Sequence, residues 1–135
     1  MYCLRALYES CCGTATIAAN SGTAEISINI GAKKYKTLRL LGEGGFSYVY
    51  LCSDSQGCLF ALKKIRCVYN ETYDLALREL HAYSTFKHPN VIKCIDHTSV
   101  DERSGKVVYL LLPYYKRGNL EDLINNNIVS CSLLY

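Results

Sequence analysis

Apolar and polar residues alternate along much of the first half of the chain, which is the pattern of half-buried β-strands. The alternation is clearest in EISINI, where Ile26, Ile28 and Ile30 share one face. Further strands are predicted where β-branched and aromatic residues gather, in the stretches YKTLRLLG, SYVYLCSD and CLFALKKIRC. The last two are joined by DSQG, which is typical of a turn. This half of the chain therefore predicts an antiparallel sheet.

The pattern changes to a helical period between residues 72 and 86. After the helix, VIKCID (91–96) and VVYLLL (107–112) predict two more strands, joined by the turn-rich DERSG. The order is several strands, one helix and two strands. It predicts an α+β domain with an antiparallel sheet of about five strands and one helix.

Three regions are expected along the 135 residues, which are enough for one domain or part of one. Residues 1–24 form an N-terminal segment that ends in the small, polar linker GTATIAANSGTA. Residues 25–123 carry all the predicted elements, and residues 124–135 form a tail that does not continue them.

The composition excludes some classes of protein. Half of the residues are apolar, a fifth are charged, and the net charge is +3, which suits a soluble globular protein. The small basic excess is spread out, so no binding of nucleic acid is expected. The sequence contains no run of about twenty apolar residues, the length that a helix needs to cross a bilayer.

Eight cysteines lie at positions 3, 11, 12, 52, 58, 67, 94 and 131. None forms a C-x-x-C pair, so the clustered ligands of a zinc site are missing and no metal site is expected. Disulfides are open by count, but no secretory signal supports them. We expect reduced thiols in the cytosol, most of them packed as small apolar side chains.

Cys3, Cys11 and Cys12 lie in the partly apolar MYCLRALYESCCG. Adjacent cysteines near a terminus are candidates for S-acylation by palmitate, which would tether the chain to a membrane. The alternative is a loose terminus with incidental cysteines. Residue 2 is Tyr2, so the glycine that N-myristoylation requires is missing.

The stretch LLGEGGFSYVYL places three glycines, Gly42, Gly44 and Gly45, between two predicted strands. A hairpin tip without side chains lets backbone N–H groups approach a polyphosphate, although a plain tight turn has the same pattern. No helix follows the glycines and G-x-x-x-x-G-K-[ST] is absent. The motif is therefore neither a dinucleotide-binding βαβ turn nor a Walker P-loop.

A lysine and a glutamate elsewhere in the sequence favour the phosphate-binding interpretation of the hairpin over a plain tight turn. Ala61 and Lys63 share a face of one predicted strand, where Ala61 and Val49 could cover a planar base and Lys63 could lie under phosphates. Lys64, on the opposite face, is expected to be solvated. Glu79 lies inside the apolar stripe of the predicted helix, where a carboxylate is costly without a cation. We expect Glu79 to pair with Lys63; the alternatives are a solvated Lys63 and a Glu79 at the stripe's margin. The full stripe consists of Leu75, Ala76, Glu79, Leu80, Ala82, Tyr83 and Phe86.

These features together resemble the N-terminal lobe of a eukaryotic protein kinase: a glycine-rich hairpin, A-x-K, an inward glutamate, HPNVI, and a strand ending LLLPYYKRGNL. The five elements occur in the right order between Tyr35 and Leu123. LGEGGFSYV with LLLPYYKRGNL is similar to the numb-associated kinase family, and within it to the branch of acylated, membrane-associated serine/threonine kinases.

The resemblance implies an ATP site. Leu41, Val49 and Ala61 would cover the adenine, Lys63 would hold the α- and β-phosphates and pair with Glu79, and Leu112 would be the gatekeeper. The hinge would run from Pro113 to Tyr115 and use the Pro113 carbonyl and the Tyr115 N–H, since proline has no N–H. The residues whose backbone would close over the phosphates are Gly42, Glu43, Gly44, Gly45, Phe46 and Ser47.

The chain departs from the kinase pattern in its chemistry. Kinases transfer phosphate with an H-R-D loop and a D-F-G aspartate that binds Mg²⁺, and neither motif occurs in these residues. The pair Asp96-His97 is expected in a turn and cannot substitute. We expect a fragment of a kinase, with its C-lobe absent, that does not catalyse transfer by itself. The alternative is a short chain that works without chemistry.

The expected partners follow from the same resemblance. They are ATP, with Mg²⁺ in the full-length family, and a protein substrate of the parent kinase. The expected location is the cytoplasm, peripheral on an endomembrane of the Golgi or vacuole type. The alternative function is a non-catalytic, membrane-tethered interaction module. Without a C-lobe, the apolar underside with Tyr83 and Leu112 is expected to be exposed.

Overall fold

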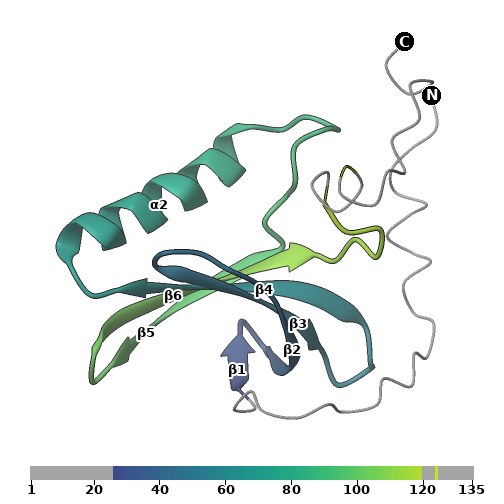
Figure 1. The fold of residues 1–135 in the computed structure, drawn as a ribbon, viewed down its shortest axis with the longest axis horizontal. Coiled ribbons are helices and arrows are strands. Elements are labelled where there is room, and N and C mark those ends of the chain that lie inside the picture. Colours follow the sequence, from purple (N-terminus) through teal and green to yellow (C-terminus); the bar gives the residue numbers. More distant parts are fainter. Residues whose placement is uncertain (1–25, 120–123, 125–135) are drawn as a thin grey trace.

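The computed structural model describes residues 26–119 and residue 124, and they form one curled sheet with one helix across it (Figure 1). The sheet has six strands rather than about five, in the order β1-β2-β3-β4-β6-β5, and every neighbouring pair is antiparallel. The α+β prediction is therefore confirmed. The elements are β1 (Ser27–Ile30), β2 (Lys33–Glu43), β3 (Ser47–Ser53), β4 (Leu59–Cys67), α2 (Asn70–Thr85), β5 (Asp96–Glu102) and β6 (Gly105–Pro113).

Tight turns hold the hairpins in register. Between β3 and β4, the Asp54 carboxylate accepts hydrogen bonds from the N–H groups of Gln56 and Cys58, both at 2.9 Å. Gly57 follows with φ of +82°, a conformation that glycine adopts without strain. The predicted DSQG turn is confirmed.

The sheet has an apolar core on each face. One core contains the buried residues of β1 and the alternate residues of β3, β4 and β6 that point the same way, among them Ile30, Cys52, Leu62 and Leu111. The other core lies under α2 (Figure 1). Its buried members are Ile65, Cys67, Ala76, Val108 and Leu110. This second face is the one that carries the candidate site.

The predicted strand over residues 91–96 is wrong, because β5 begins only at Asp96. The Ile95 N–H donates to the Leu111 carbonyl at 2.7 Å, and the segment upstream of it is not in a strand. The strand that pairs with β5 is β6, and it ends at Pro113, which has no N–H to continue the ladder. The edge strand runs from Asp96 to Glu102 and takes in the first two residues of the predicted DERSG connection, so Asp96-His97 lies in β5 rather than in a turn.

The helix is confirmed, but its buried stripe is narrower than predicted. Thr72 and Ala76 are buried, and Tyr73, Leu80 and Tyr83 pack against the core under α2. The predicted stripe members Leu75 and Phe86 are 59% and 61% exposed. Leu75 lies in the second turn of α2, and Phe86 is the C-cap residue that follows the helix.

Candidate functional site

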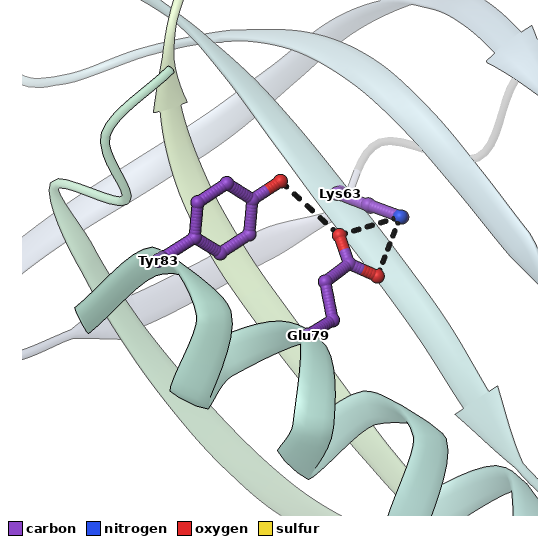
Figure 2. A network of polar contacts seen from close by, with 3 residues as sticks. All are labelled: Lys63, Glu79 and Tyr83. Carbon is purple, nitrogen blue, oxygen red and sulfur yellow. Dashed lines mark hydrogen bonds and ion pairs between the residues drawn. The ribbon is translucent and has the colours of Figure 1, made fainter. Parts of the chain in front are cut away.

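Lys63 of β4 and Glu79 of α2 form an ion pair beneath the helix (Figure 2). The Lys63 Nζ lies 2.7 Å from Oε1 and 2.8 Å from Oε2 of Glu79, so one ammonium bridges both carboxylate oxygens. The side chains are 24% and 30% exposed, respectively. The predicted pairing is confirmed, and the alternative interpretations of a solvated Lys63 and a marginal Glu79 are excluded.

The strand register puts the other predicted residues on the same face as this pair. Val49 lies opposite Lys63 across β3 and β4, and Leu112 lies opposite Ala61 across β4 and β6. Directly opposed residues in a sheet point to the same side. An apolar surface of half-buried Val49 and Ala61 therefore adjoins the ammonium of Lys63.

Leu41 reaches this region through an irregularity in β2. The register of β2 against β3 shifts between Leu40, which faces Tyr50, and Gly42, which faces Val49. Leu41 is the extra, half-buried residue of this bulge. Bulges bend a strand and redirect its side chains, and this one precedes the glycine-rich hairpin directly.

The tip of the hairpin is fixed by two backbone hydrogen bonds. The Gly44 N–H donates to the Ser47 carbonyl at 2.8 Å, and the Arg66 N–H donates to the Phe46 carbonyl at 2.8 Å. The Phe46 side chain is 56% exposed. The N–H of Gly44 is therefore already engaged, so in this conformation it is not a donor for a phosphate.

Nothing within the described chain requires glycine at two of the three hairpin positions. A Cβ at Gly42 or at Gly45 would have no atom within 4 Å, and none of the three glycines has a left-handed backbone. At Gly44 a Cβ would lie 3.3 Å from the Ser47 Oγ. Open space above these glycines fits a group that approaches the backbone from outside.

The predicted hinge begins at the end of β6. Pro113 is the last residue of the strand, and the exposed Tyr115 follows it, its carbonyl accepting a hydrogen bond from the Gly118 N–H at 3.3 Å. Leu112 is only 7% exposed. The expectation that Leu112 would be exposed is therefore wrong. Tyr83, expected to be exposed as well, is half-buried because it packs against the core under α2.

Lys64 was expected to be solvated, and this too is wrong. Its ammonium lies 3.5 Å from Oε1 of Glu102 and 5.7 Å from the centre of the Tyr109 ring. Phe60 and Leu62 share its face of β4 and belong to the buried core there. Both faces of β4 are therefore covered. The sequence already indicated this, because apolar residues occur on both faces of the strand.

Tyr83 is a residue of the site that the sequence interpretation missed. Its hydroxyl donates to Oε1 of Glu79 at 3.1 Å (Figure 2). Burial, together with the neighbouring Glu79 carboxylate, raises the pKa of Tyr83 to about 12. The spacing of four residues from Glu79 was the available signal, since such residues are neighbours on a helix.

The described residues offer no obvious metal site and no membrane crossing. Within residues 26–119 and 124, no three His, Cys, Asp or Glu side chains are grouped as a metal ion would require. The same residues contain no helix with the length and apolar character needed to span a bilayer. The acylation candidates Cys3, Cys11 and Cys12 lie outside the described part of the chain.

The protein kinase domain family matches residues 35–132, most of the chain. The chain belongs to this family. The described part of the kinase has the architecture of an N-lobe, six antiparallel strands with one helix, and the second lobe of the kinase fold is not among the described residues.

The kinase chain is similar to several serine/threonine-protein kinases. It is 48% identical over 102 residues to a probable serine/threonine-protein kinase of Dictyostelium discoideum. It is 39% identical over 120 residues to serine/threonine-protein kinase ENV7 of Saccharomyces cerevisiae, and 38% identical over 110 residues to serine/threonine-protein kinase 16 of Rattus norvegicus. These alignments cover 74%, 80% and 80% of the chain but only 28%, 33% and 34% of the three relatives. The chain thus spans about a third of the length of these relatives.

Proposed function

We propose that this chain is the ATP-binding lobe of a serine/threonine protein kinase of the numb-associated family. The observation that carries the proposal is the ion pair between Lys63 and Glu79, which lies on the sheet face beside Val49 and Ala61 and next to a glycine-rich hairpin. Relatives named as serine/threonine-protein kinases support the same reaction class.

Lys63 is oriented to bind an anion. An ammonium has three N–H donors, and the two oxygens of Glu79 accept two of them. The third donor is left for a phosphate oxygen. Because Glu79 fixes the ammonium at the face that also carries Val49 and Ala61, a nucleotide whose base covers these apolar side chains would place its phosphates near Lys63.

The remaining contacts are proposed from the residues that the sheet brings together. Leu41, Val49 and Ala61 would contact the adenine, the backbone N–H groups near Gly42 and Gly45 would approach the phosphates, and the Pro113 carbonyl would accept from the base. The open space at both glycines supports this arrangement. Leu112, being buried, would contribute only the edge that β4 leaves uncovered.

Phosphoryl transfer itself is proposed for a longer protein that contains this lobe. ATP with Mg²⁺ supplies the phosphoryl group in protein kinases, and the H-R-D and D-F-G motifs hold the metal and orient the hydroxyl. Neither motif occurs in these 135 residues. We therefore expect the 135-residue chain alone to lack transferase activity, and the substrate to be a serine or threonine of another protein.

Nucleotide titration followed by backbone NMR tests the site. On adding MgATP, we expect the amide signals of Val49, Ala61 and Lys63 to shift, and the shifts to be lost in Lys63→Ala. The matched control is Lys64→Ala, which removes a neighbouring lysine on the opposite face of β4. Shifts confined to that opposite face, or unchanged in Lys63→Ala, would contradict the proposed site.

A membrane tether is proposed on the strength of the sequence alone. Cys3, Cys11 and Cys12 are the candidate palmitoylation sites, and two acyl chains would hold the protein on a cytoplasmic endomembrane of the Golgi or vacuole type. Changing Cys11 and Cys12 to Ser should move a tagged chain from membranes to the soluble fraction. Cys58→Ser, in the β3–β4 hairpin, is the control, and equal partitioning of all three proteins would reject the tether.

The second candidate function is a membrane-tethered interaction module without chemistry. It is favoured by two large, exposed apolar side chains, Leu75 of α2 and Phe86 at the C-cap of this helix. Retained partner binding by a Lys63→Ala variant that has lost nucleotide binding would favour this module over the kinase lobe.

A further inference from the structure

Glu79 has two partners, and they arrive from different elements. Its Oε1 accepts from the Lys63 ammonium of β4 at 2.7 Å and from the Tyr83 hydroxyl of the same helix at 3.1 Å (Figure 2). Among the described residues, Oε2 accepts from Lys63 alone, at 2.8 Å. A phenol has a single proton to donate. Tyr83 therefore spends its only donor on the carboxylate that orients Lys63.

The ring of Tyr83 is itself held by its surroundings. It packs with Leu80 and Cys94 against the core under α2. The Cys94 thiol donates to the Asp96 carbonyl at 3.2 Å, and the Ile95 N–H donates to β6, so this wall of the Tyr83 environment is tied to the sheet. A hydroxyl on a ring fixed in this way is a directional constraint on whatever accepts from it.

The hydrogen bond from Tyr83 restricts rotation of the Glu79 carboxylate. A glutamate carboxylate turns about a broad terminal torsion, so an ion pair with one flexible lysine leaves its plane free to change. A second donor on Oε1, coming from the helix rather than from the strand, fixes both the plane of the carboxylate and the identity of the oxygen that Lys63 shares. The direction of the remaining Lys63 N–H is then fixed as well.

The opposite face of the sheet carries a similar lysine, glutamate and tyrosine, but there the carboxylate is held less closely. There Oε1 of Glu102 lies 3.5 Å from the Lys64 ammonium and accepts from the Tyr109 hydroxyl at 3.3 Å. Both distances are longer than those at Glu79, and no bridging of two carboxylate oxygens by one ammonium is found there among the described residues. The lysine–glutamate–tyrosine combination is thus closely coupled only on the α2 face.

We propose that Tyr83 is a positioning residue that acts through Glu79 to fix the orientation of Lys63. The structure assigns this role to the hydroxyl, and the aromatic ring serves only to carry it. The use of the oriented ammonium for a nucleotide phosphate rests on the proposed function, whereas the orientation itself is a property of the chain without ligand.

The test compares Tyr83→Phe, Glu79→Gln and Tyr109→Phe in the full 135-residue chain labelled with ¹⁵N-lysine. The Lys63 ammonium signal, assigned through Lys63→Arg, should exchange slowly with water in the unaltered protein and be lost in Glu79→Gln. In Tyr83→Phe it should exchange several-fold faster. Tyr109→Phe removes a hydroxyl that also donates to a glutamate, and it should leave the Lys63 signal unchanged.

A double-mutant cycle gives the second measurement. Tyr83→Phe should raise the equilibrium constant for unfolding by about two- to tenfold when Glu79 is present, the range of one net hydrogen bond, and change it little in the Glu79→Gln background. Equal effects in both backgrounds, with an unchanged Lys63 signal, would show that Tyr83 only stabilises the helix and would overturn the proposal.

The two levels of the inference fail separately. A Tyr83→Phe variant that loosens the Lys63 ammonium supports the positioning role whether or not ATP binds. If ATP does bind the unaltered chain, Tyr83→Phe should weaken it less than Lys63→Ala does. If the cycle shows no coupling between Tyr83 and Glu79 while the unaltered chain binds nucleotide, the positioning role of Tyr83 is rejected and the proposed function still stands.

Discussion

Two glycines of the described chain, Gly105 and Gly45, differ in their surroundings, and substitution by alanine can distinguish their roles. Gly105 has φ of +124°, and a Cβ there would lie 2.8 Å from the Cys67 carbonyl oxygen. Gly45 has neither a left-handed backbone nor any neighbour within 4 Å of an added Cβ. Local crowding and backbone conformation therefore account for glycine at position 105, whereas neither requires glycine at position 45.

We predict different effects on stability for the two alanine substitutions. Gly105→Ala should destabilise the fold by about 1–3 kcal/mol in urea unfolding, since the residue is strained and crowded. Gly45→Ala should stay within about 1 kcal/mol of the unaltered protein but weaken any MgATP-induced shifts. A Gly45→Ala variant that unfolds early would show that the glycine is needed for the hairpin itself.

Burial of two phenols predicts how stability depends on alkaline pH. Burial, reinforced by a neighbouring glutamate, raises the pKa of both Tyr83 and Tyr109 to about 12, from 10.0. The folded state thus keeps protons that the unfolded state releases. The stability that these groups contribute is complete below pH 10 and is lost as pH rises toward 12.

Urea unfolding between pH 9 and 12 measures this loss. Tyr83→Phe with Tyr109→Phe should flatten the decline above pH 10. Burial also raises the pKa of Cys52 to about 12, from 9.0, so a decline that begins near pH 9 should persist in the double variant. A slope identical in both proteins would contradict the assignment of the tyrosines.

At the residue scale, the sequence predicted an interaction correctly where only one partner residue was available. A carboxylate in an apolar stripe needed a cation, and Lys63 was the available one, so the pair with Glu79 could be predicted. Tyr83 was missed because its aromatic ring satisfied the apolar pattern, which leaves the destination of the hydroxyl undetermined. Lys64 was misplaced because one apolar face of β4 was considered and the other was not.

At the scale of elements, the strands and the helix could be predicted, but their partners could not. Periodicity detects which residues are half-buried, and it placed β1, β2, β3, β4 and α2 correctly. Residues 91–96 are also rich in apolar side chains, yet all of them except Asp96 lie before the start of the ladder between β5 and β6. Pairing depends on where the neighbouring strand ends, which no local pattern encodes.

The docking of α2 gives a prediction at this scale. Ala76 is buried where the helix meets the core of Val108 and Leu110, so Ala76→Leu should overpack the contact and destabilise by about 1–3 kcal/mol. Leu75→Ser, one residue earlier but exposed, should change stability by less than about 0.5 kcal/mol. Urea unfolding of both variants decides which flank of the helix is packed, and a larger effect at Leu75 would contradict the docking described here.

At the scale of the whole molecule, the site has one wall. The α2 face supplies Val49, Ala61 and the Lys63–Glu79 pair, all from the sheet and the helix above it. The described residues that the strand register groups around Lys63 all come from this one face of the sheet. A lobe with an ordered ion pair and a one-sided apolar surface is arranged for a ligand but offers it little burial.

We therefore predict that the 135-residue chain binds ATP weakly. Transfer of apolar surface from water contributes about 25 cal/mol per Å², and only one side of the adenine would be covered. The buried Leu112 reduces that side further. Electrostatics add little, because Lys63 is already neutralised by Glu79 at 2.7 Å and the N–H of Gly44 is engaged by Ser47. A polyphosphate would meet a pair with no net charge.

Calorimetric titration of MgATP into the purified chain measures the affinity, with Lys63→Ala and Lys64→Ala as matched variants on the two faces of β4. We expect a dissociation constant in the millimolar range or weaker, equivalent to a binding free energy of about 4 kcal/mol or less at 1 M standard state. Of the two variants, only Lys63→Ala should weaken the affinity further. A micromolar or tighter affinity that disappears in Lys63→Ala would contradict this prediction, because it would mean that one wall, one oriented ammonium and a glycine-rich hairpin suffice to hold the nucleotide.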